Sequence, residues 1–173
     1  MTGEVIEVPG LSRAAIRTYV QQVHEVVKFV QPPFPVVQFA EGLHTYFPNY
    51  TFAVLDEDEL GNNHGLTMPA EKVMLIRRDV YEGACSDGGR DRLTIAHEVG
   101  HLLLHDSIAF ARRMPTKQVP AYRSSEWQAN CFAGELLVPA WWLRQVGRIS
   151  ATDVANICKV SLEAADYQLS HQN

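Results

Sequence analysis

The chain has 173 residues, of which 46% are apolar and 20% are charged. This length suits one domain with a substantial core, and the composition excludes a largely disordered protein. The net charge of -5 at pH 7 lacks the basic footprint of proteins that bind nucleic acid, so we expect no direct contact with nucleic acid.

Cysteine usage and hydropathy favour a cytoplasmic location. No stretch approaches the roughly 18 consecutive apolar residues that a membrane helix needs, and the acidic N-terminus does not resemble a secretory signal. The three cysteines, Cys85, Cys131 and Cys158, are odd in number and widely spaced, which indicates reduced thiols rather than a disulfide framework. We expect a cytoplasmic protein without membrane association.

The N-terminal part of the chain predicts two helices. Apolar residues at helical spacing predict a first helix from about Leu11 to Val30, ended by Pro32 and Pro33. A shorter helix is expected over residues 36–47. Both apolar stripes should face the core. The first stripe comprises Ile16, Tyr19, Val20, Val23, Val26, Val27 and Val30.

A small sheet is expected next. Residues 50–55 and 72–76 are rich in β-branched and aromatic side chains, which predicts strands. A third strand is expected at residues 64–68, where Pro69 must end it or leave it at an edge, because proline donates no ladder hydrogen bond. An extended protein substrate could add to this edge. The strand consists of His64, Gly65, Leu66, Thr67 and Met68.

The central region predicts two further helices. Residues 91–105 are apolar almost all round at helical spacing, which indicates a buried helix. A polar connection follows over residues 106–123. Ser125 with Gln128 three residues later resembles a capping box, which would open a helix that Pro139 closes.

The C-terminal segment, residues 150–173, predicts short helices packed on the rest of the domain. Its pattern echoes a helix-turn-helix, but the second helix carries Glu163 and Asp166 and neither Arg nor Lys. A recognition helix facing phosphates would need basic residues, so packing is the expectation. The expected N-caps are Ser150 or Thr152, and Ser161.

The sequence His97-Glu98-Val99-Gly100-His101 carries the clearest chemistry. In a helix, a spacing of four places both imidazoles on one face, where they can occupy two corners of a tetrahedral zinc site. Glu98 would then act as the general base, taking a proton from the attacking water and passing it to the leaving amine. Two unpaired histidines and a glutamate would be costly to bury without such a partner.

Zinc requires a third ligand, for which Glu126 is the favoured residue. Asn130 follows one turn later, so its carbonyl could accept a hydrogen bond from a ligand histidine. Glu135 is the competing ligand, on another face of the same helix. His105 lies about 12 Å along the helix axis from His97, too far to share one ion, and is expected to have a supporting role.

Two blocks resemble the ImmA/IrrE family of zinc metallopeptidases: residues 92–105, which contain the histidine motif, and residues 125–139. The resemblance implies a compact, gluzincin-like α+β domain with a small sheet beside the active-site helix, spanning residues 1–173. It places the family's zinc ligands on His97, His101 and Glu126, and its catalytic glutamate on Glu98.

The resemblance also implies a substrate. Characterised members of the family cleave helix-turn-helix repressors of mobile elements or stress responses. No basic DNA-binding domain precedes the motif, so a repressor substrate would be a separate chain. The alternative is a zinc-binding regulatory protein, of phage or toxin-antitoxin type, that binds its partner without proteolysis. The residue that stabilises the oxyanion stays open among Tyr122, Arg123, Tyr167 and His105.

Overall fold

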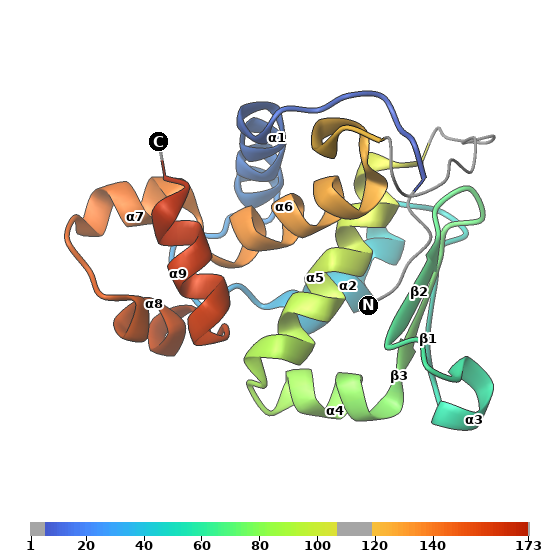
Figure 1. Cartoon of the computed structure of the whole chain (residues 1–173). Helices are drawn as coiled ribbons and strands as arrows, with labels where there is room; N and C mark the ends of the chain where they lie inside the picture. Colours follow the sequence, from blue (N-terminus) through green and yellow to red (C-terminus); the bar gives the residue numbers. More distant parts are fainter. Residues whose placement is uncertain (1–5, 107–118, 173) are drawn as a thin grey trace.

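The computed structural model describes residues 6–106 and 119–172, and the structural statements below concern these residues. The fold is α+β, as predicted (Figure 1). The helices are α1 (Arg13–Val26), α2 (Val36–Gly42), η1 (Leu43–Thr45), α3 (Glu57–Leu60), α4 (Arg78–Cys85), α5 (Gly89–Leu104), η2 (Ala121–Arg123), α6 (Ser125–Leu137), α7 (Ala140–Val146), α8 (Ala151–Cys158) and α9 (Leu162–Ser170). The strands are β1 (Thr51–Leu55), β2 (Gly65–Met68) and β3 (Val73–Arg77).

The three strands form one sheet in the order β1-β3-β2. β3 runs parallel to β1 and antiparallel to β2, with Thr67 of β2 opposite Met74 of β3. Met74 and Ile76 are fully buried on the face that α5 covers. The strand predictions are confirmed to within a residue, and β2 lies at an edge and ends directly before Pro69, as expected.

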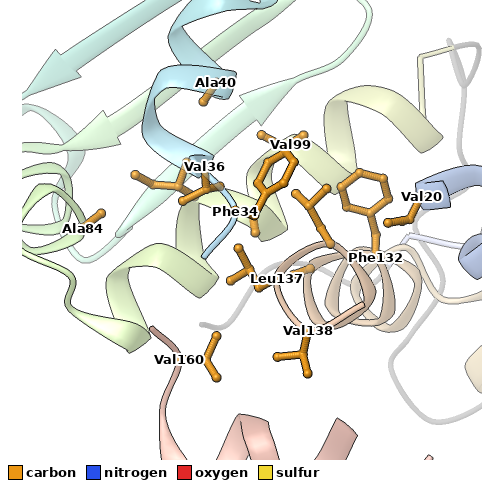
Figure 2. Packing of buried hydrophobic residues seen from close by; sticks show 14 of the residues in the cluster. Val20, Phe34, Val36, Ala40, Ala84, Val99, Phe132, Leu137, Val138 and Val160 are labelled. Carbon is orange, nitrogen blue, oxygen red and sulfur yellow. The ribbon is translucent and has the colours of Figure 1, made fainter. Parts of the chain in front are cut away.

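Helix α5 is the centre of the fold, packed between the sheet and α6 (Figure 1). Its buried side chains meet those of α2 and α6 in one hydrophobic cluster, which includes Phe34, Val99 and Phe132 (Figure 2). Burial of each large apolar side chain contributes about 1.5–3 kcal/mol relative to exposure. Among the described residues, no helix is both long and apolar enough to cross a membrane.

The prediction for the first helix is wrong at its C-terminal end. α1 ends at Val26, well before the two prolines, because Lys28 adopts a positive φ of 56° and turns the chain. The backbone N–H of Phe29 then donates to the carbonyl of His24 (2.8 Å), and the two rings pack 4.8 Å apart. Val26 and Val30 are consequently 63% and 77% exposed rather than part of the core face.

Two short helices were not predicted. α3 is only four residues long and is capped at its N-terminus by a capping box between Asp56 and Glu59. α4 starts directly after β3, without a turn residue to mark the boundary, and buries Val80 and Ala84 one turn apart.

The predicted capping box at α6 is also wrong. The hydroxyl of Ser124, rather than Ser125, accepts from the backbone N–H of Trp127 (3.2 Å). The predicted N-caps Ser150 and Ser161 are confirmed for α8 and α9. Most of the polar connection expected over residues 106–123 lies outside the described residues.

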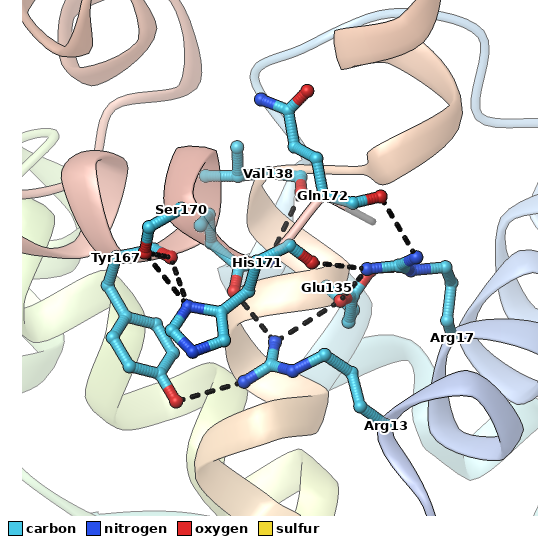
Figure 3. A network of polar contacts seen from close by, with 9 residues as sticks. Arg13, Arg17, Glu135, Val138, Tyr167, Ser170, His171 and Gln172 are labelled. Atoms are coloured by element: carbon cyan, nitrogen blue, oxygen red, sulfur yellow. Dashed lines mark hydrogen bonds and ion pairs between the residues drawn. The ribbon is translucent and has the colours of Figure 1, made fainter.

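Helix α9 is tied to α1 and α6 by the buried carboxylate of Glu135 (Figure 3). Arg17 donates to both of its oxygens, at 3.0 and 3.1 Å, and Arg13 donates to one at 3.3 Å. Arg17 also donates to the carbonyls of His171 and Gln172 at the end of α9. These charge-assisted bonds connect three helices that are far apart in the sequence.

A second buried polar group, His24 on α1, makes stability depend on pH. Its Nε2 lies 3.1 Å from the carbonyl of Leu136, and its Nδ1 accepts from Trp141 (3.3 Å). Both bonds fit a neutral ring with its proton on Nε2. Burial lowers the pKa of His24 to about 4, against the smaller opposing effect of the Leu136 carbonyl.

We predict that His24 destabilises the fold in acid. Below a pH of about 6.5, which is the pKa of His24 in the unfolded chain, the unfolded chain binds a proton at His24 that the folded chain does not bind. Stability therefore falls until the pH reaches about 4. Between about pH 7.5 and pH 4.5 the loss from this group should be roughly 2–3 kcal/mol. Urea unfolding of the wild type and His24→Gln at both pH values measures it. The difference in free energy of unfolding between the wild type and His24→Gln should shrink by that amount at low pH. A difference that stays constant with pH would refute the lowered pKa of His24.

Candidate metal centre

Three donor side chains converge where α5 and α6 meet. The Nε2 atoms of His97 and His101 lie 3.0 Å apart on neighbouring turns of α5. The carboxylate of Glu126, in the first turn of α6, lies opposite them, with Oε2 3.4 Å from His97 and Oε1 3.2 Å from His101. His97 is almost completely buried, whereas the His101 and Glu126 side chains are 16% and 22% exposed. The site is therefore enclosed on one side and open to solvent on the other.

Close packing of the two helices produces this convergence. Gly100 lies between the two histidines on α5, and a Cβ there would come within 3.1 Å of the Cα and carbonyl oxygen of Ala129 on α6. Glycine leaves the space for this backbone approach, whereas an added Cβ would be in tight contact with α6. The spacing of the motif thus serves two purposes, since it aligns the imidazoles and places the smallest residue at the contact.

The donor set fits a zinc ion. Neighbouring ligands around tetrahedral zinc, at bond lengths of about 2.0–2.1 Å, lie about 3.3 Å from each other. The three observed separations, from 3.0 to 3.4 Å, bracket that value. Burial raises the pKa of Glu126, but the adjacent His101 and His97 outweigh it and hold this pKa below its usual range. The carboxylate is therefore ionised, as a metal ligand must be.

Asn130 lies one turn after Glu126, where the sequence analysis expected it. Its Oδ1 is 3.0 Å from Nδ1 of His97. Because the amide oxygen of Asn130 accepts, the ring proton of His97 lies on Nδ1. The Nε2 atom of His97 then has a lone pair directed at His101 and Glu126.

Glu98, the residue after His97 on α5, points towards the edge strand. It is 7% exposed, and the hydroxyl of Thr67 on β2 donates to its Oε2 at 2.7 Å. Gly65 allows the carboxylate to lie against the strand, because a Cβ at that position would stand 2.7 Å from Cγ of Glu98. Sequence reasoning did not identify Thr67 and Gly65 as partners of Glu98, since their contact depends on how the strand crosses the helix.

His105 lies behind the donor set rather than in it. Its Nδ1 is 3.1 Å from Nδ1 of His101, and its Nε2 is 3.1 Å from Oε1 of Gln128. Burial, and then the neighbouring His101, lower the pKa of His105 to about 4. Both ring nitrogens are thus engaged, and neither is free to stabilise an oxyanion.

The other residues considered from the sequence have different partners. Glu135 is bound by Arg13 and Arg17 at the far end of α6 (Figure 3). At the same end, the hydroxyl of Tyr167 accepts from Arg13 (3.0 Å). Arg123 pairs with Glu7 (2.8 Å). The ring of Tyr122 is half exposed and flanks Gly10.

Comparisons with known proteins identify a family and a similar fold. A family model for peptidase M78, described as the IrrE N-terminal-like domain, matches residues 55–170. Nothing among curated proteins matches the chain. Among solved structures it is similar to a Mycobacterium tuberculosis transcriptional regulator, with 18% identity and a TM-score of 0.61. This similarity covers 90% of the chain but 46% of the regulator, so the chain spans about half the regulator's length and the likeness is one of fold.

The family match includes α5, α6, β2 and β3, but only the last residue of β1. It covers the two blocks on which the resemblance to ImmA/IrrE metallopeptidases was based. The chain therefore belongs to the peptidase M78 family and carries its metallopeptidase-like, IrrE N-terminal-like domain.

Proposed function

We propose that this protein is a zinc-dependent endopeptidase in which His97, His101 and Glu126 hold the metal and Glu98 is the general base. The observation that carries the proposal is the convergence of two imidazole nitrogens and a carboxylate at 3.0–3.4 Å, open to solvent on one side. Three protein ligands with an open position are typical of catalytic zinc, whereas structural sites have four.

The chemistry divides between the metal and the chain. A bound zinc ion would polarise the scissile carbonyl and make water more acidic. Glu98 accepts a proton from the attacking water and returns it to the leaving amine. Thr67 donates to one oxygen of Glu98 (2.7 Å) and thereby fixes the orientation of the carboxylate. The second oxygen, Oε1, is left for proton transfer.

The edge strand β2 supports a protein substrate bound in an extended form. Among the described residues, no strand pairs with the outer edge of β2. This strand also carries Thr67 and Gly65, which contact Glu98. A substrate segment that adds there would run past the base, with its backbone held by main-chain hydrogen bonds. We propose a separate helix-turn-helix repressor as the substrate, because the family resemblance implies one, and a cytoplasmic setting, in keeping with three free thiols.

The metal assignment predicts different outcomes for two glutamates on α6. The purified protein should hold about one zinc per chain. Glu126→Ala should lose it, because the variant removes a donor. Glu135→Ala should keep it and instead lose stability, since it leaves Arg13 and Arg17 without their buried partner. Inductively coupled plasma mass spectrometry and thermal unfolding of all three proteins measure both effects.

Glu135→Ala is the matched control, because it makes the same change on the same helix away from the donors. Zinc retained by Glu126→Ala and lost by Glu135→Ala would transfer the ligand role to Glu135. Zinc absent from the wild type after loading would contradict the metal site altogether.

The mechanism predicts that Glu98→Gln abolishes cleavage without disturbing the metal. The amide keeps the shape of the carboxylate and can still accept from Thr67, but it cannot take up the proton. General-base catalysis is worth about 10²–10⁴-fold, so cleavage should fall by that factor while zinc content and partner binding remain. The variant should therefore trap the substrate, which can be recovered from the native host by affinity purification and examined for fragments alongside the wild type.

A complementation assay separates proteolysis from binding. Glu98→Gln should fail to restore the phenotype of a deletion strain, whereas the wild type restores it. Full restoration by Glu98→Gln would show that hydrolysis is not the function, and the zinc-dependent regulatory protein that acts by binding would then be the better interpretation.

A further inference from the structure

The side-chain amide of Gln128 is held in one orientation inside the protein. Gln128 is 1% exposed, and its Nε2 donates to the backbone carbonyls of Pro9 and Tyr122, both at 2.8 Å. Two carbonyl oxygens can face only the nitrogen of an amide, and both N–H groups are used. Oε1 is therefore fixed as an acceptor on the side that faces His105.

This orientation determines where the proton of His105 lies. Nε2 of His105 is 3.1 Å from Oε1 of Gln128 and must donate to it, since an amide oxygen only accepts. A neutral imidazole has one N–H, and here Nε2 carries it. Nδ1 of His105 is consequently an acceptor.

The same reasoning extends to the next ring. Nδ1 of His101 lies 3.1 Å from Nδ1 of His105, so His101 must carry its proton on Nδ1 and donate it. The Nε2 atom of His101 is then left with a lone pair, directed at His97 and Glu126.

We propose that Gln128 and His105 are positioning residues that hold His101 in the tautomer able to bind the metal. The inference rests on the proposed metal-binding function but adds a device outside the ligand set. In zinc proteins a ligand histidine usually donates its other N–H to a carboxylate, a carbonyl or water. Here a neutral imidazole takes that place, and it can accept only because Gln128 holds it in the right tautomer.

The hydrogen bonds that run from Gln128 through His105 to His101 are called the relay below. The relay begins in the N-terminal segment that precedes α1. This segment is held beside the start of α6 by a bridge between Glu7 and Ser124 and by a bond from the N–H of Val8 to the carbonyl of Arg123 (2.9 Å). Pro9 follows directly and presents its carbonyl to Gln128. The metal site is thereby supported by residues that lie before the family match, which starts at residue 55.

Substitutions in the full-length protein test the relay through zinc affinity, measured by competition with a chromophoric chelator. His105→Leu removes the acceptor, whereas His105→Asn keeps one, because Oδ1 of asparagine is as many bonds from the backbone as Nδ1 of histidine. Loss of such a partner typically weakens zinc binding by about 10–100-fold. We expect that loss for His105→Leu and Gln128→Met, and a change of less than about threefold for His105→Asn.

Gln168→Met is the matched control for Gln128→Met. Gln168 is also buried in a helix, at 4% exposure, but it bonds Arg13 and Val138 at the other end of α6. Its variant should lose stability and keep wild-type zinc affinity. Wild-type affinity in folded His105→Leu and Gln128→Met, or equal losses in the Leu and Asn variants of His105, would overturn the relay.

A spectroscopic measurement on the zinc-loaded wild type does not depend on how the variants fold. With ¹⁵N-labelled histidine, the coupling across the N–H···N bond between His101 and His105 should show the proton bonded to Nδ1 of His101. A proton bonded to Nδ1 of His105 would overturn the proposal. Failure of the proposed function has a different signature, in which the wild type binds no zinc or His101→Ala binds it as tightly as the wild type.

Discussion

The close approach of α5 and α6 at Gly100 is the constraint on which the candidate site depends. The two histidines belong to one helix and Glu126 to the other, so their separations of 3.2 and 3.4 Å exist only while the helix backbones stay close. A Cβ at Gly100 would meet the backbone of Ala129 at 3.1 Å. Backbone atoms cannot yield as a flexible side chain can, so a larger residue would separate the donors.

The apolar cluster supplies the force for that approach. Val99 of α5 and Phe132 of α6 are fully buried in the same cluster, to which Phe34 contributes from the segment before α2 (Figure 2). Hydrophobic burial is non-directional, and the polar contacts supply the direction that it lacks. Asn130 orients the first imidazole, and the Glu135 network holds the far end of α6 against α1.

Helix α5 carries both parts of the proposed chemistry on adjacent faces. His97 and His101 face α6, whereas the next residue of the motif, Glu98, faces the sheet and meets Thr67. A residue that accepts protons beside a metal should be oriented without being a ligand itself. Strand β2 provides that orientation, and its free edge lies where an extended substrate could run past the base.

Much of this arrangement could be predicted from the sequence, because its signals are local. A spacing of four in a helix defines a face, and Pro69 requires the strand before it to end there or to lie at an edge. The donor set and Asn130 are therefore found close together, as expected. The exposed Val26 and Val30 show the limit, since a stripe can continue past the residue at which the chain turns.

The errors at the site have a common cause. Gln128 resembles a capping residue from its distance to Ser125, yet its amide points at Pro9, more than a hundred residues away in the chain. The roles of Thr67 and Gly65 likewise follow from the crossing of β2 over α5. Contacts of this kind are set by tertiary packing and leave no local spacing in the sequence.

X-ray absorption spectroscopy at the zinc edge tests the ligand set most directly. The three cysteines are free, and burial raises the pKa of Cys131 to about 11, so this thiol stays protonated and is a poor ligand. The spectrum of the loaded protein should show only nitrogen and oxygen at about 2.0–2.1 Å, with outer-shell scattering from two imidazoles. Sulfur at about 2.3 Å, or scattering from fewer than two imidazoles, would contradict the proposed centre.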